Sequence, residues 1–121
     1  MTKTLLEKMF LKPEYSVAIL HAPEELKLDL KIDNTDKKLQ TTYNFILAFY
    51  LKKESFEKDG EYLENALRQN GLLWIAYPKA KALQSDLNRD ILHQTAKQFN
   101  LDGVSLISLN ETWSAMRFKI K

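Results

Sequence analysis

The feature that most constrains the fold is the unbroken apolar run Leu72–Tyr77, which follows Gly71 and stops at Pro78. A short run of this kind is typical of a strand that is buried on both faces. Pro78 lacks an amide donor and ends the strand, and Lys79 follows it directly. Ligands of open α/β sheets bind just beyond the carboxyl ends of such strands. Tyr77 and Lys79 are therefore the first candidate ligand-binding residues.

Four more segments predict strands. Ser16–Leu20 and Tyr43–Leu51 are short apolar runs that we expect in the core, and Val104–Leu109 is another. Residues Trp113–Ile120 alternate between two faces, as a strand does. Because only Asn110–Thr112 separates the last two segments, we expect them to form a hairpin.

The segments before the second strand are less regular. Apolar residues recur at helical spacing between Leu5 and Phe10, and Pro13 ends that pattern, so a short helix against the sheet is expected. Leu26 to Ile32 alternate with polar residues and predict an edge strand, followed by a turn over 33–36.

Two longer helices are predicted between the later strands. The first begins at Ser55 or Asp59 and ends at Gln69, where Asn70-Gly71 is a typical helix stop. The second is capped by Ser85, is closed by Asn100, and carries an apolar stripe. That stripe consists of Leu87, Ile91, Leu92, Ala96 and Phe99.

This order of elements predicts an α/β fold. Strand-helix-strand units require right-handed crossovers and parallel strands. We expect one Rossmann-like three-layer sandwich over residues 1–121, with helices on both faces of a mainly parallel sheet and an antiparallel C-terminal strand. A chain of 121 residues is close to the common size of one domain.

Composition excludes several classes of protein. The chain has no cysteine, so disulfides, zinc-thiolate sites and a cysteine nucleophile are ruled out. Its 18 basic and 16 acidic residues are interspersed, which disfavours a nucleic-acid partner. The sequence contains neither an apolar stretch of membrane-spanning length nor a secretory signal, so we expect a cytoplasmic protein without a membrane partner.

Several blocks of sequence resemble an uncharacterised bacterial family of unknown function. They are Lys12-Pro13, His21-Ala22-Pro23, Leu73–Lys79 and Glu111-Thr112-Trp113-Ser114, in that order along nearly the whole chain. The resemblance implies no activity, because the family itself has none assigned. It departs at His21, where the family usually has asparagine.

The order of the elements is also similar to the carboxyl half of class I S-adenosylmethionine-dependent methyltransferases. This resemblance implies that the last strand inserts between Leu72–Tyr77 and Val104–Leu109. Those enzymes have a glycine-rich turn after the first strand, where the backbone approaches the cofactor. Here the turn after the first strand is His21-Ala22-Pro23-Glu24-Glu25 and contains no glycine.

Candidate ligand-binding residues gather at the predicted carboxyl edge. His21 ends a strand and has the chemistry of an acid or base, although a histidine bonded to a backbone carbonyl has the same pattern. Lys52 and Lys79 follow predicted strands, and Arg89 lies nearby on the next predicted helix; the three would suit an anion, or they are simply solvated. Trp113 starts the last strand and either lines a pocket or packs in the core.

Other patterns argue against specific chemistry. Asp86 is expected in the first turn of the helix after Lys79, where its charge competes with a phosphate for the helix dipole. The chain lacks the Gly-x-Ser-x-Gly motif of serine hydrolases. Its two histidines, His21 and His93, are far apart and do not form a metal-ligand pair. We therefore predict neither catalytic nor metal-ligating residues.

The sequence leaves the function open and the cofactor unassigned. The first hypothesis is a non-enzymatic module that binds a small anionic ligand or a protein partner at the carboxyl edge of the sheet. The alternative is an enzyme with His21 and Lys79 in its site, or a divergent methyltransferase-like protein.

Overall fold

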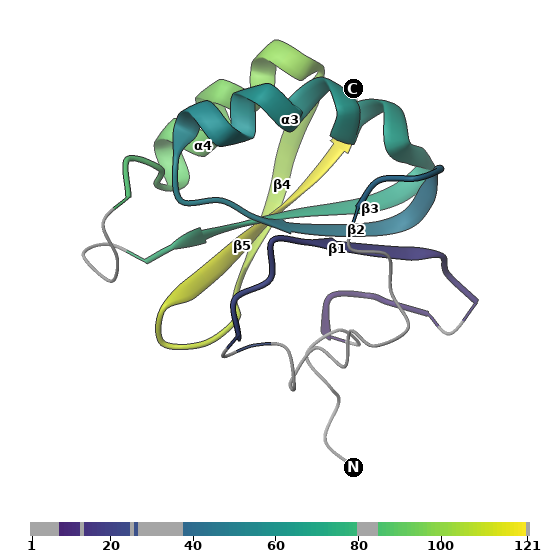
Figure 1. Cartoon of the computed structure of the whole chain (residues 1–121), viewed down its shortest axis with the longest axis horizontal. Helices are drawn as coiled ribbons and strands as arrows, with labels where there is room; N and C mark the ends of the chain where they lie inside the picture. Colours follow the sequence, from purple (N-terminus) through teal and green to yellow (C-terminus); the bar gives the residue numbers. More distant parts are fainter. Residues whose placement is uncertain (1–7, 13, 25, 27–37, 80–84, 121) are drawn as a thin grey trace.

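Five strands form one mixed sheet in the order β1-β2-β3-β5-β4 (Figure 1). The computed structural model describes residues 8–12, 14–24, 26, 38–79 and 85–120. Its elements, in chain order, are β1 Val17–Leu20, β2 Tyr43–Phe49, α3 Lys53–Ala66, β3 Leu67–Pro78, α4 Arg89–Ala96, the 3₁₀ turn η2 Lys97–Phe99, β4 Leu101–Ser108 and β5 Trp113–Ile120.

The sheet has the predicted direction of strands. β1, β2 and β3 pair in parallel, whereas β5 is antiparallel to both β3 and β4. The predicted hairpin is confirmed, and the last strand inserts between β3 and β4 as the methyltransferase resemblance implied. The chain is therefore an α/β protein with a Rossmann-like sheet, as expected.

Helices α3 and α4 lie side by side on one face of the sheet (Figure 1). Apolar residues of α3 and α4, such as Phe56, Leu63 and Leu92, are fully buried against that face. On the other face, Met9 and Leu26 are buried against the strands. α3 and α4 cover the first face, and Leu26, which is helical, is buried on the second, so the expected three-layer arrangement is confirmed.

The anchor of the second face is Trp74, which lies within the apolar run Leu72–Tyr77. Its indole is almost completely buried, and its Nε1 donates a hydrogen bond to the carbonyl oxygen of Met9 at 3.1 Å. A buried indole N–H needs such a partner. This contact joins the N-terminal segment to the centre of the sheet, and the expectation that Trp74 is a core residue is confirmed.

The predicted end of the first long helix is wrong. We expected it to continue to Gln69, but α3 ends at Ala66 and β3 begins at Leu67, which pairs with Tyr43. Asn70 does adopt the left-handed conformation of a helix stop, with φ of 63°. It lies instead where the β2–β3 register shifts, from Leu67 opposite Tyr43 to Leu72 opposite Phe45. Pairing with β2 therefore overrides the local signal.

The start of the second long helix is also later than predicted. α4 begins at Arg89 and is capped by Asn88, whose Oδ1 accepts a hydrogen bond from Ile91 N at 2.9 Å. Ser85 is not its cap: its hydroxyl donates to the carbonyl of Leu51 and accepts from Leu87 N. The predicted stop at Asn100 is confirmed by its left-handed φ of 58°.

Strand bounds differ from the prediction by a few residues. β2 ends at Phe49 rather than Leu51, and β1 starts at Val17. β4 begins at Leu101 and ends at Ser108, because its ladder with β5 extends past the apolar run. Most of the predicted first helix and of the edge strand Leu26–Ile32 lies outside the described residues.

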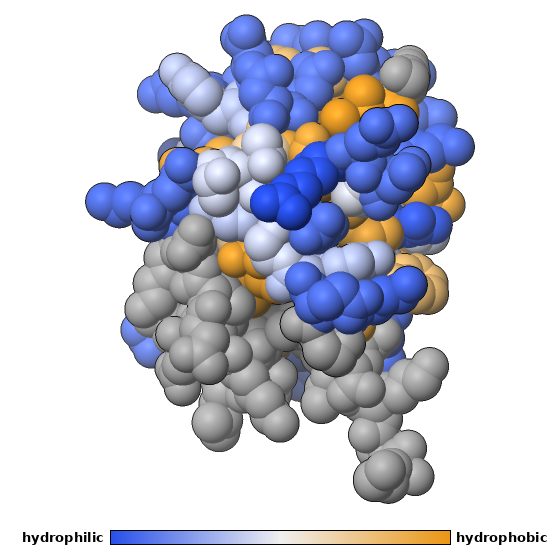
Figure 2. Space-filling model, turned by 90° about the vertical axis from the view of Figure 1, so that its right-hand side faces the viewer, coloured by the Kyte–Doolittle hydropathy of each residue, from blue (hydrophilic) through white to orange (hydrophobic). Residues whose placement is uncertain are grey.

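On the face that Figure 2 shows, hydrophilic residues predominate among the described residues, and apolar residues appear between them in several patches. The residues at the start of β3, 68–70, are exposed. Within the described part of the chain, no helix is long and apolar enough to cross a membrane.

Asp86 holds the beginning of α3. Its Oδ1 accepts a hydrogen bond from the amide of Lys53, the first helical residue, at 2.7 Å, and the preceding Lys52 provides no side-chain cap. The expectation that Asp86 belongs to the first turn of the following helix is therefore wrong. The carboxylate stabilises the N-terminus of α3 from a distant loop.

We expect Asp86→Ala to lower the free energy of unfolding by about 1 kcal/mol, the usual cost of losing a helix cap. Urea unfolding followed by circular dichroism measures this change. Asp86→Asn retains an acceptor and should lose less. Glu61→Ala, at an exposed position of α3, is the control and should stay within about 0.5 kcal/mol of the parent chain. If Asp86→Ala and the control were equally stable, Asp86 would not be the cap that stabilises the start of α3.

Candidate functional site

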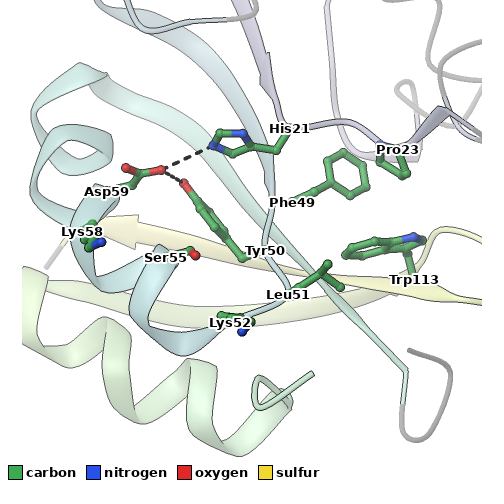
Figure 3. A pocket seen from close by; sticks show the side chains of 10 residues that line it. All are labelled: His21, Pro23, Phe49, Tyr50, Leu51, Lys52, Ser55, Lys58, Asp59 and Trp113. Carbon is green, nitrogen blue, oxygen red and sulfur yellow. Dashed lines mark hydrogen bonds and ion pairs between the residues drawn. The ribbon is translucent and has the colours of Figure 1, made fainter. Parts of the chain in front are cut away.

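A pocket of about 600 Å³ opens at the carboxyl ends of β1 and β2, beside the start of α3 (Figure 3). Its volume is typical of small-molecule sites, which range over roughly 300–1,000 Å³. The residues that line it are His21, Pro23, Phe49, Tyr50, Leu51, Lys52, Ser55, Lys58, Asp59 and Trp113. This is the edge of the sheet at which the sequence predicted a site.

Three polar side chains form a network on one wall of the pocket. The hydroxyl of Tyr50 donates a hydrogen bond to Oδ2 of Asp59 at 2.6 Å, and Nε2 of His21 lies 3.5 Å from the same oxygen (Figure 3). The His21 ring also meets the Tyr50 ring edge-on, with 5.5 Å between their centroids. Tyr50 directly follows β2, His21 lies in the turn after β1 and Asp59 belongs to α3, so the network exists only in the folded chain.

Burial raises the pKa of the Tyr50 hydroxyl well above its usual range, and the hydrogen bond and the charge of Asp59 raise it further. Tyr50 is therefore a protonated donor at neutral pH, and Asp59 is its acceptor. The tyrosine fixes the orientation of the carboxylate but leaves Asp59 accessible, since 36% of the Asp59 side chain remains exposed.

His21 has a left-handed backbone conformation in the turn after β1. His21 has a φ of 59°, a region that glycine adopts readily and other residues rarely. Its side chain is held beside Tyr50 and Asp59. The expected alternative for His21, a bond to a backbone carbonyl, is not among its contacts with the described residues.

The opposite wall of the pocket is aromatic. Phe49 and Trp113 are almost fully buried, and their rings pack edge-to-face with centroids 5.2 Å apart. The turn before β5 holds Trp113 in place, because Oδ1 of Asn110 accepts a hydrogen bond from Trp113 N at 2.7 Å. The sequence left two positions open for Trp113, the core or the wall of a pocket. Trp113 is both buried in the core and part of the pocket lining.

The mouth of the pocket next to α3 carries positive charge. Lys52 follows the end of β2 and is exposed, and Lys58 is paired with Glu54 at 3.5 Å. Lys52 makes no ion pair with the residues that the structure describes. The exposed hydroxyl of Ser55 lies between these two lysines along the helix.

The structure brings three of the six predicted ligand-binding residues to this pocket, namely His21, Lys52 and Trp113. Lys79 lies elsewhere and supports the hairpin: its Nζ donates to Oγ of Ser108 and its backbone N donates to Thr112 O, both at 2.7 Å.

Arg89 and Tyr77 also lie outside this pocket. Arg89 lines a smaller hollow of about 310 Å³ between α4 and β4, and its Nε lies 3.7 Å from Asp90. Tyr77 is buried in the cluster beneath the helices. Burial raises the pKa of Tyr77, while Arg89 lowers it and Asp90 raises it.

Asp59, Ser55 and Tyr50 are among the seven pocket residues that the sequence did not predict. A periodic signal was present, because Ser55 and Asp59 are four residues apart and so share one helix face. Starting the helix at Ser55 or Asp59 hid that face, since α3 begins at Lys53. Tyr50 was expected in the core; it is buried, yet it also lines the pocket.

The donor set suits an organic ligand. It offers aromatic edges, one carboxylate, a hydroxyl, an imidazole and ammonium groups. Among the residues described, no group of histidine and acidic side chains is placed to hold a metal ion.

The fold is shared with known methyltransferases. A ribosomal protein L11 methylase from Lactobacillus delbrueckii subsp. bulgaricus superposes with a TM-score of 0.61 at 12% identity, over 96% of this chain and 74% of that chain. The CcbJ methyltransferase from Streptomyces caelestis superposes with a TM-score of 0.62 at 8% identity, over 96% of this chain and 93% of that chain.

A third solved structure contains a ligand. LepI, in complex with S-adenosylhomocysteine and a substrate analogue, superposes with a TM-score of 0.61 at 12% identity, and this chain spans 47% of its length. No family model matches the chain, and no curated protein matches its sequence, so the resemblance to an uncharacterised bacterial family is not supported by a family model. At these identities, the structures establish the methyltransferase fold.

We expect the raised pKa of Tyr50 to make stability depend on alkaline pH. The unfolded chain releases this proton near pH 10, before the folded chain does, so the free energy of unfolding falls as the pH rises above about 10. Tyr50→Phe should reduce this slope, measured by urea unfolding between pH 9 and 11, at roughly half-unit steps. Tyr62→Phe, at a residue that is 67% exposed, is the control and should keep the slope. If the free energy of unfolding changed with pH by the same slope in both variants, the pKa of Tyr50 would not be raised in the folded chain.

Proposed function

We propose that this chain is a divergent methyltransferase-like protein that binds S-adenosylmethionine, S-adenosylhomocysteine or a closely related nucleoside in the pocket beside His21 and Asp59. The observation that carries the proposal is the position of this pocket, at the carboxyl ends of β1 and β2 in a methyltransferase-type sheet. Ligands of open α/β sheets bind at that edge. Among the structural neighbours, LepI has been solved with S-adenosylmethionine and with S-adenosylhomocysteine.

The pocket residues suit such a nucleoside. The volume of about 600 Å³ accommodates a ligand of this size. The aromatic edges of Phe49 and Trp113 suit a purine ring, and Asp59 suits the hydroxyls of a ribose. Lys52 would lie close to the carboxylate of the ligand. When bound, S-adenosylmethionine supplies a methyl group on a positively charged sulfur.

The mode of binding would differ from that of a glycine-rich turn. His21 reproduces the left-handed backbone, but its side chain occupies the space that a glycine leaves open. Pro23 also lacks an amide donor. The ligand would therefore be held mainly by side chains rather than by the backbone of the turn after β1.

This proposal takes up the methyltransferase-like alternative and sets aside the non-enzymatic module as the leading hypothesis. It also sets aside an enzyme that uses His21 together with Lys79, because the Lys79 ammonium is bonded to Ser108 and does not line the pocket. A small ligand remains the expected partner, but we no longer expect this ligand to be a simple anion. The absence of a nucleic-acid partner and the cytoplasmic location stay predictions.

We expect S-adenosylhomocysteine to bind in titration calorimetry and to raise the melting temperature. Ligand at about 100 times its Kd stabilises the folded state by roughly 2.7 kcal/mol, which corresponds to a shift of several degrees. Ser55→Trp should abolish the shift, because the indole would fill the pocket from an exposed position of α3.

Glu61→Trp is the matched control, since it places the same side chain at an exposed position of α3 that does not line the pocket. It should bind the nucleoside as the parent chain does. If the parent chain binds neither S-adenosylmethionine nor S-adenosylhomocysteine at millimolar concentration, the proposed function is wrong.

A further inference from the structure

One edge of the sheet has no further strand paired to it among the described residues. β4 is the last strand of the sheet and pairs with β5 alone. The strand at the opposite edge, β1, has three of its four residues buried, whereas β4 consists of half-buried and exposed residues after Leu101. β4 also lacks lysine and proline, which proteins use to protect a sheet edge from pairing, and Asp102 is its only charged residue. β4 thus offers the outer backbone groups that an added strand would bond.

This edge is apolar at its centre. Leu106 is 48% exposed and Val104 is 39% exposed, although both belong to a strand. The register of β4 on β5 shifts between Gly103 and Ser105, and the regular stretch that follows runs from Ser105 to Ser108. An exposed apolar side chain in a regular, unpaired stretch is typical of an edge that pairs with another strand. Leu106 lies in that stretch and is the centre of the candidate surface.

Two opposite charges lie beside Leu106. A hollow of about 310 Å³ lies between β4 and α4, and Leu106, Arg89 and Asp90 all line it. The Arg89 and Asp90 side chains are 64% and 87% exposed, so both can meet a partner. An acidic or a basic partner would meet one like charge here, whereas a second copy of this surface, related by a two-fold axis, would place Arg89 against Asp90 twice. The charges therefore favour the chain itself as the partner.

We propose that β4 pairs antiparallel with β4 of a second copy of this chain, across a two-fold axis at Leu106. This register sets Leu106 opposite its own copy and Ser105 opposite Ile107. Ser105 and Ile107 lie on the same face of β4, so like faces of the two sheets join, and the two five-stranded sheets become continuous. The pocket beside His21 shares no lining residue with this surface, so the dimer does not depend on the proposed function.

Sedimentation of the full chain tests the association. Between about 1 and 300 µM chain, the parent protein should pass from the 14.1 kDa monomer to a species of twice that mass. Leu106→Lys should weaken the dimer about 100-fold, because the axis sets the two ammonium groups against each other. Tyr62→Lys is the matched control, since it places the same charge at an exposed position of α3, and it should associate as the parent chain does.

Charge reversal tests whether the partner is a second copy of the same surface. Arg89→Asp alone and Asp90→Arg alone should each weaken the dimer about tenfold, because each sets like charges against each other. The variant with both changes again carries one charge of each sign and should recover most of the parent affinity. Circular dichroism verifies that each variant is folded.

Cysteine cross-linking tests the register. The chain has no cysteine of its own, so a single substituted cysteine forms a disulfide only with another copy of the chain. Leu106→Cys should cross-link under mild oxidation, because opposite residues of antiparallel strands have Cα atoms about 4.5–5.5 Å apart, within the range of a disulfide. Asp102→Cys is the control on the same strand. Its two copies would lie about 26 Å apart, four residues from the axis on each side, and should not cross-link.

Each result supports or overturns the dimer. A parent chain that stays a monomer at every concentration overturns it. A dimer that Leu106→Lys and Tyr62→Lys weaken equally also overturns it, because the association then uses another surface. A double charge variant that is as weak as the single variants, or equal cross-linking of Leu106→Cys and Asp102→Cys, overturns the two-fold axis at Leu106. Nucleoside binding still tests the proposed function in every case.

Discussion

The insertion of β5 between β3 and β4 is the constraint on which the rest of this structure depends. It pairs with the backbone of both neighbouring strands at once, and it places Pro78 opposite Trp113 at the carboxyl edge of the sheet. Trp113 thereby reaches Phe49 of β2, although the two residues are 64 positions apart in sequence. Without this antiparallel strand the aromatic wall of the pocket would not form. The same ladder explains why Lys79 is occupied with hairpin contacts rather than with a ligand.

Helix α3 connects the fold to the chemistry of the pocket. Its start is held by Asp86 from the loop before α4, and its buried face, including Phe56 and Leu63, packs on the sheet. These contacts determine the rotation of the helix, and the rotation decides that Asp59 approaches His21 and Tyr50. A polar network of this kind requires accurate placement, because each donor and acceptor at a partly buried position needs its partner.

Much of the sheet, and part of the site, was predictable from the sequence. Apolar runs predicted four of the described strands because burial on both faces leaves a strong pattern, and alternation predicted the fifth. His21, Lys52 and Trp113 were expected at the ligand-binding edge. The pocket partners were not predictable in full. Asp59 and Ser55 are polar residues on a helix surface, and such residues have the same pattern whether they face solvent or a cavity. Asp86 and Asn70 were misassigned because distant strand pairing and a contact with Lys53 overrode their local preferences.

By itself, the sequence determined the class of fold, the direction of the strands and the edge of the sheet at which a site would lie. Those properties follow from hydrophobic periodicity and chain connectivity, which are local in sequence. Only the tertiary structure decided that His21, Asp59 and Tyr50 form one network and that Lys52, but not Lys79 or Arg89, lines the same pocket. These choices depend on the rotation of α3 and on the turn after β1. Both are set by packing between segments that are far apart along the chain.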